Sequence, residues 1–128
     1  MVTQSESKWE SAERIDLFFK EFDQTSLFTF SENDIERNDN FKVLLSSKNE
    51  IIELIKNLSK ACDVASDMKE EQMDLYLLIK GHGPNKQEMT WKSSPFHFYD
   101  SNIGKICVLK SKDRERISQL IHKFSVSH

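Results

Sequence analysis

Apolar side chains recur at helical spacing in residues 46–65, "SSKNEIIELIKNLSKACDVA". The recurring positions are Ile51, Leu54, Ile55, Leu58 and Cys62. Because this period places them on one face of an α-helix, the segment predicts an amphipathic helix. Ser47 stands three residues before Glu50, which is the spacing of a capping box at the start of a helix.

A second helical pattern lies near the C-terminus, in residues 111–124, "SKDRERISQLIHKF". Its apolar positions are Ile117, Leu120, Ile121 and Phe124. They follow the i, i+3, i+4, i+7 spacing of an amphipathic helix, and Ser111 is a suitable N-cap. We therefore expect a C-terminal amphipathic helix.

Several stretches have the length and residue types of β-strands. They are "SLFTF" (26–30), "FKVLLSS" (41–47), "MDLYLLIK" (73–80) and "GKICVLK" (104–110). The near-continuous apolar run in 73–80 suits the middle of a sheet. In 104–110, Ile106 and Val108 alternate with Cys107 and Leu109, so both faces of this strand are expected to be covered.

Residues 9–22 fit two patterns. Trp9, Ala12, Ile15, Phe19 and Phe22 have helical spacing, whereas Ile15, Leu17 and Phe19 alternate as in a strand. We expect a short helix that merges into a strand.

The stretch from residue 80 to 100, "KGHGPNKQEMTWKSSPFHFYD", contains two of the three glycines and both prolines. Glycine permits positive φ, Pro84 fixes its own φ and Asn85 tolerates a turn. The stretch therefore predicts a hairpin turn followed by aromatic strands of a meander. Pro95 precedes one of these strands, which favours a strand start or a sheet edge.

The order of strands, helix, strands and helix predicts one α+β domain over residues 1–128. Its sheet is expected to be mostly antiparallel, with about five strands and with helices packed on one face. The apolar fraction of 38% and the charged fraction of 30% are ordinary for a folded globular protein. No secretory signal is visible and no window approaches the ~18 apolar residues of a membrane span, so we expect a cytoplasmic domain with no membrane partner.

Cys62 and Cys107 are the two cysteines of the chain, and they form no CxxC motif. This usage indicates neither a disulfide framework nor a zinc site. We expect two reduced thiols that pack as small hydrophobic groups.

The net charge of −3 is unevenly distributed. Residues 1–79 hold 17 acidic and 9 basic residues, a net charge of −8, whereas residues 80–128 hold 4 acidic and 9 basic residues, a net charge of +5. A nucleic-acid-binding domain usually has a basic excess throughout, so nucleic acid is not the expected partner.

Little in the sequence favours chemistry at a site. His82 and His97 lack the short fixed spacing of zinc ligands, and "GHG" is not followed by the helix that a phosphate loop requires. No nucleophile stands in a recognisable motif with a base. The sequence therefore predicts a non-enzyme with no metal and no cofactor.

The acidic residues of "SENDIERNDN" (31–40) are the first candidates for a partner-binding surface. They are Glu32, Asp34, Glu36 and Asp39. Such a loop can steer a basic partner and bind its Arg or Lys residues. The alternative interpretation is a solvated loop without a function.

The aromatic residues of 91–99 offer a similar choice. Trp91 and Tyr99 carry polar groups that favour an interface rim, and we consider both as partner-binding anchors. Phe96 and Phe98 share a face of the expected strand and are predicted to fill the core.

A resemblance to a known class of proteins follows from these segments. "FKVLLSSKNEIIELIKNL", "MDLYLLIK", the turn at "GHG", "FHFYDSNIGKICVLK" and "DRERISQLI" together resemble small bacterial α+β immunity proteins of toxin systems, including contact-dependent growth inhibition. The resemblance is one of periodicity and assigns no functional residue. It implies an inhibitor that binds one cognate toxin, with a nuclease that has a basic surface as the expected partner.

Two alternatives remain open at this point. One is a small-molecule or anion-binding domain that uses His82, Lys86, Lys92 and His97 of the basic segment 80–100. The other is a non-catalytic subunit of a larger assembly, which a sheet edge near Pro95 would permit.

Overall fold

The computed structural model describes residues 9, 11–19, 35, 42–44, 48–62, 64–69, 72–101 and 103–127 of the chain. Its elements in chain order are β1 (Arg14–Phe19), β2 (Lys42–Leu44), α3 (Lys48–Lys60), β3 (Leu77–His82), the 3₁₀ turn η3 (Pro84–Lys86), β4 (Glu88–Ser93), β5 (His97–Asp100), β6 (Lys105–Val108) and α4 (Ser111–Ser127).

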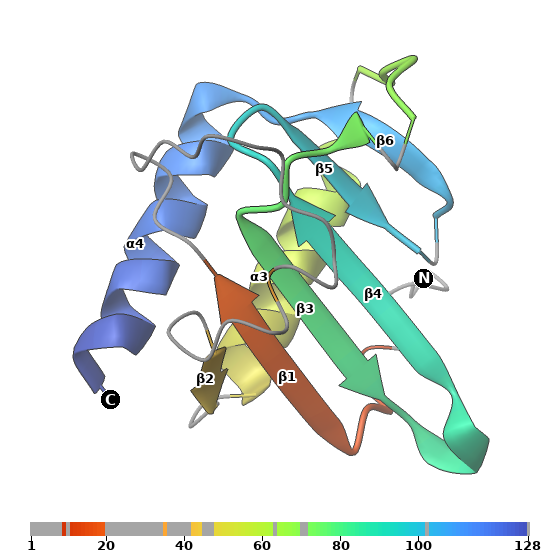
Figure 1. The fold of residues 1–128 in the computed structure, drawn as a ribbon, viewed down its shortest axis with the longest axis vertical. Coiled ribbons are helices and arrows are strands. Elements are labelled where there is room, and N and C mark those ends of the chain that lie inside the picture. The colour runs from red at the N-terminus through yellow and green to blue at the C-terminus, as the bar shows by residue number, and fades with distance from the viewer. Residues whose placement is uncertain are drawn as a thin grey trace.

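Six strands form one antiparallel sheet in the order β2-β1-β3-β4-β5-β6. From β3 onward each strand pairs with the next along the chain, so β3 to β6 form a meander (Figure 1). The predicted α+β class, with an antiparallel sheet and a C-terminal helix, is confirmed. The strand expected at 26–30 lies outside the described residues.

Both helices pack on the same face of the sheet. In Figure 1, α3 crosses behind the strands and α4 runs alongside it. Ile117 of α4 belongs to the same buried cluster as the apolar stripe of α3 and the strand residues that face it. The predicted packing of helices on one face is therefore confirmed. Neither α3 nor α4, as far as the structure describes them, is long and apolar enough to cross a membrane.

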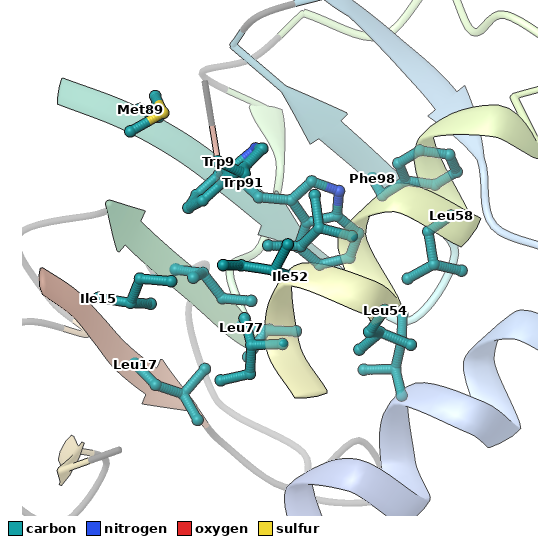
Figure 2. Packing of buried hydrophobic residues seen from close by; sticks show 14 of the residues in the cluster. Trp9, Ile15, Leu17, Ile52, Leu54, Leu58, Leu77, Met89, Trp91 and Phe98 are labelled. Carbon is teal, nitrogen blue, oxygen red and sulfur yellow. The ribbon is translucent and has the colours of Figure 1, made fainter. Parts of the chain in front are cut away.

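The main core lies between this face and the helices, as Figure 2 shows. From α3 it takes Ile51, Ile52, Leu54, Ile55 and Leu58, and from β1 and β3 it takes Ile15, Leu17, Phe19, Leu77 and Ile79. The strand residues follow a period of two and the helix residues a period of 3.6, so each element turns its apolar side to the other. Each large side chain buried in this way contributes about 1.5–3 kcal/mol.

The opposite face of the sheet is covered in part. Phe18 and Leu78 pack with Ile35, and a third cluster joins Met73 and Leu75 to Ile106. Because Leu77, Leu78 and Ile79 are all buried, β3 is covered on both faces, as its continuous apolar run predicted. The strand begins at Leu77, later than the expected residue 73, because Met73 and Leu75 belong to the third cluster instead.

The N-terminal segment forms a strand, as the alternation of its apolar residues predicted. Residues Arg14–Phe19 form β1, in which Ile15, Leu17 and Phe19 all face the helices. Trp9 has helical backbone and its carbonyl accepts a hydrogen bond from the N–H of Ala12. The expected strand is confirmed, and Trp9 is the single described residue of the helical turn expected before it.

The predicted hairpin after β3 is confirmed. Gly83 N–H donates to the carbonyl of Gln87, and Gln87 N–H donates to the carbonyl of Pro84. Asn85 and Lys86 have φ values of 59° and 63°, in the left-handed region that such tight turns require.

Cys62 and Cys107 form a disulfide, which corrects the expectation of two reduced thiols. The bond joins the residues just after α3 to β6, with their Cα atoms 5.6 Å apart. The sequence separation of 45 residues hides this proximity, because only the packing of α3 across the sheet brings the two cysteines together.

Trp9 lies directly on the backbone of β3. Its side chain is fully buried, and a Cβ atom at Gly81 would be 2.7 Å from Cζ3 of the indole and 3.3 Å from Cε of Met89. Glycine is therefore required at position 81 because a ring occupies the space of a side chain, and not because of its φ angle.

We predict that Gly81→Ala lowers the free energy of unfolding by about 1–3 kcal/mol, since the added methyl group overpacks this contact. Urea denaturation provides the measurement. Gly83→Ala is the matched control, because its nearest neighbour would be at an ordinary 3.5 Å. In a Trp9→Leu background the cost of Gly81→Ala should shrink, and equal costs at positions 81 and 83 would contradict the packing.

Reduction of the disulfide should destabilise the fold. The cross-link closes a loop of 45 residues, which corresponds to about 4 kcal/mol in a chain-entropy estimate. Denaturant unfolding with and without reductant measures this loss, and Cys62→Ala/Cys107→Ala protein should be insensitive to reductant. Two free thiols per chain in the unreduced folded protein would show that the bond does not form.

Candidate functional site

Trp91, one of the two predicted aromatic anchors, lies in the core. It belongs to β4, its side chain is fully buried, and its ring stacks on Phe98 with the ring centroids 5.8 Å apart. A side chain without exposure cannot touch a partner of the folded chain, so the prediction of Trp91 as an anchor is wrong. Met89, Trp91 and Ser93 occupy alternate positions of the strand and are all buried. This spacing could have indicated from the sequence that Trp91 faces the core.

Tyr99, the other predicted anchor, lies in β5 on the sheet face away from the helices. It is half-buried, and Nζ of Lys92 lies 5.4 Å from the centre of its ring. Tyr99 also borders a pocket of about 320 Å³ together with Met68, Lys105 and other residues. Its role in partner binding stays a prediction.

The acidic residues proposed for partner binding, Glu32, Asp34, Glu36 and Asp39, lie outside the described residues. Ile35, between them in the sequence, is described and is fully buried. The acidic surface therefore stays a prediction.

Phe96 is on the surface, which corrects its expected place in the core. It is 58% exposed, whereas Phe98 is buried. The cause is the turn before β5: the backbone N–H groups of Phe96 and His97 both donate to Oγ of Ser94, so Phe96 precedes the strand. Of the two expectations for Pro95, the start of a strand is confirmed, because β5 begins at His97, and the sheet edge is wrong, because β5 lies between β4 and β6.

The exposed ring of Phe96 lies beside a charged side chain of α4. The guanidinium carbon of Arg114 lies 5.0 Å from the centre of the Phe96 ring, a cation–π arrangement. Val64 and Val108 are exposed too, and a hydrogen bond from Val108 N–H to the Val64 carbonyl joins their segments, but Val108 points to the sheet face away from the helices. We call Phe96 and Arg114 the edge patch. Sequence reasoning missed it, although "SSPF" could have indicated a turn that exposes its phenylalanine.

The four residues of the alternative anion site do not converge. His82 and Lys92 lie on the same sheet face, but they are not neighbours. His82 in β3 pairs with Glu88 in β4, and Lys92 lies four residues further along β4, where it pairs with Leu78. Lys92 is buried above Tyr99, and Lys86 is in the hairpin turn. His97 lies on the same face of β5 as Tyr99, the partner of Lys92 across the strands, so His82 and Lys86 at the hairpin are separated from Lys92 and His97, and the anion-binding alternative stays a prediction.

His82 is the last residue of β3 and has a charged partner. Its Nε2 lies 3.0 Å from Oδ2 of Asp16, and Nη2 of Arg14 lies 3.3 Å from the same oxygen. A carboxylate can orient an imidazole for proton transfer, but catalysis also requires a reacting group beside it. Within the described ranges, no group of three metal-binding side chains comes together.

A groove of about 330 Å³ separates the outer sides of α3 and α4. Its lining consists of Glu50, Glu53, Leu54 and Asn57 from α3, and Arg116, Gln119, Leu120 and Lys123 from α4. Each helix contributes positions i, i+3, i+4 and i+7, which form one stripe on a helix surface. Lys123 Nζ donates to Oε1 of Glu50 at 2.7 Å and joins the two walls.

No protein-family model matches this chain, and comparison with curated proteins and with solved structures likewise found no match. Any functional conclusion therefore depends on the residues of the chain itself.

Proposed function

We propose that this chain is a protein-binding inhibitor module, an immunity protein that binds and neutralises a cognate toxin, with a nuclease as the expected target. The observation that carries the proposal is the exposure of Phe96 beside Arg114. Aromatic and arginine side chains are frequent anchors in protein interfaces, where they fill pockets of the partner.

The anchor is held in a fixed position. The carbonyl of Phe96 accepts a hydrogen bond from Leu109 N–H at 2.8 Å, and the N–H of Phe96 donates to Ser94 Oγ. The guanidinium of Arg114 lies over the ring. Because the side chain is positioned before binding, less conformational entropy is lost when a partner covers it.

The acidic residues Glu32, Asp34, Glu36 and Asp39 supply the second part of the proposal. A nuclease needs a basic groove to neutralise phosphates, and clustered carboxylates attract such a groove over a distance. In this account the acidic residues accelerate the encounter, and Phe96 slows dissociation.

The redox state of Cys62 and Cys107 bears on the compartment. A cytoplasmic inhibitor, as the sequence predicted, would carry reduced thiols, since the cytosol keeps thiols reduced. The disulfide instead favours an oxidising compartment such as the bacterial periplasm, where the inhibitor would bind the toxin before the toxin reaches nucleic acid. A thiol count on protein alkylated at cell harvest distinguishes these two locations.

The cognate toxin is expected in the neighbouring reading frame, and co-expression with it should restore growth. In that complex, we predict that Phe96→Ala raises the Kd at least about 30-fold, because loss of an interface anchor costs about 2 kcal/mol or more. The variant's free energy of unfolding should stay within about 0.5 kcal/mol of the wild type.

Ile103→Ala is the matched control for Phe96→Ala, because Ile103 is 37% exposed but lies in the turn between β5 and β6, outside the edge patch. An unchanged Kd for Phe96→Ala would remove the edge patch from the interface. If the neighbouring genes encode metabolic proteins instead of a toxin, the proposal of an immunity protein loses its support.

Charge reversal in the acidic segment should act on association. Asp34→Lys/Glu36→Lys is predicted to lower the association rate constant and to flatten its dependence on ionic strength, since steering is screened by salt. Stopped-flow mixing over a salt series measures both. The matched control is the double variant Glu13→Lys/Asp67→Lys, which changes the net charge by the same amount at exposed positions outside the acidic segment. If the two double variants lowered the association rate constant equally, a local acidic surface would be contradicted.

A further inference from the structure

We propose that the Cys62–Cys107 disulfide is a redox-sensitive latch that holds residues 64–66 over the outer edge of β6. Three observations point to it. Residues 64–66 pair with the last strand of the sheet, their side chains are largely exposed, and the two cysteines are unequally buried. The latch does not rest on toxin binding.

Residues 64–66 cover the side of β6 that faces away from β5. Ser66 N–H donates to the Ile106 carbonyl at 2.8 Å, and Val108 N–H donates to the Val64 carbonyl at 2.8 Å. An antiparallel bridge lies between these two hydrogen bonds. Because β6 is the last strand of the sheet, its outer N–H and C=O groups would otherwise be open to other chains. Residues 64–66 therefore protect a sheet edge.

This cover is weakly held by its own contacts. Val64 is 54% exposed and Ala65 is also exposed, so neither side chain is buried against the sheet. The net stabilisation from two backbone hydrogen bonds does not offset the conformational entropy that is lost when three residues become ordered. The disulfide at Cys62, two residues before Val64, supplies the missing constraint.

The disulfide is accessible to a reductant from one side. Cys62 is partly exposed, whereas Cys107 is 1% exposed. A thiolate of a dithiol reductant therefore attacks Sγ of Cys62 and forms a mixed disulfide, and Sγ of Cys107 leaves as a thiolate that takes up a proton. The second thiolate of the reductant then displaces Cys62, which is protonated in turn. Two electrons pass to the cysteines, and the reductant leaves as its own disulfide.

Reduction then changes β6 from a covered strand into an open sheet edge. Val108 N–H and the Ile106 carbonyl exchange their partners in residues 64–66 for solvent. The other side of the strand stays paired with β5, and the next residue, Leu109, still donates its N–H to the Phe96 carbonyl. The latch therefore controls access to the edge without moving Phe96, and its state follows the redox conditions of the compartment.

Amide hydrogen exchange, followed by NMR on the wild-type protein with and without dithiothreitol, tests the latch. The amides of Ser66 and Val108 should be protected in the oxidised protein. In the reduced protein both should exchange at rates close to those of an unstructured chain. Leu109 should stay at least about tenfold slower, because its amide is released only when the sheet opens.

The Cys62→Ala/Cys107→Ala protein is the control for the reductant. It should show the open pattern without dithiothreitol and should not respond to it, and if it does not fold, the wild type with reductant still decides. Equal protection of Val108 and Leu109 in the reduced protein would overturn the proposal, because the cover would have stayed in place. Loss of protection at all three amides would also overturn it, since the disulfide would then hold the whole fold.

Discussion

The packing of α3 across one face of the sheet determines which side chains this chain can offer to another molecule. Alternate residues of β1, β3, β4 and β5 meet the apolar stripe of α3, and these contacts include Trp91 and Phe98. The same packing brings Cys62 to Cys107. The aromatic side chains of residues 91–99 are thus divided: Trp91 and Phe98 stabilise the fold, Tyr99 is half-buried, and Phe96 is exposed.

Two surfaces follow from this arrangement, and they have different chemistry. The edge patch is apolar with one guanidinium group, and it presents a positioned anchor of the kind that protein interfaces use. The groove between α3 and α4 is polar, and the ion pair of Glu50 and Lys123 bridges it. Because Arg114 belongs to the first and Arg116 to the second, the two surfaces can be altered separately on the same helix.

Sequence periodicity was sufficient for the elements with a strong pattern. The buried stripe of α3 contains four of its five predicted residues and, in addition, Ile52, whereas Cys62 is only partly buried. Ile117 of α4 is buried as expected, and the hairpin at Asn85 forms where glycine and proline indicated. Contacts between distant segments could not be predicted in this way. The disulfide, the Asp16–His82 pair and the groove all depend on how elements pack, and a period within one segment contains no information on that packing. Phe96 was misplaced because a strand pattern was extended into a turn.

The central claim is that the side chain of Phe96 is available to a partner and that of Trp91 is not. Hydroxyl-radical footprinting of the folded protein, read by mass spectrometry at each aromatic residue, tests it directly. The account predicts rapid labelling of Phe96 with protection of Trp9 and Trp91, and loss of labelling at Phe96 when a bound partner is present. Rapid labelling of Trp91 with protection of Phe96 in the free protein would contradict it.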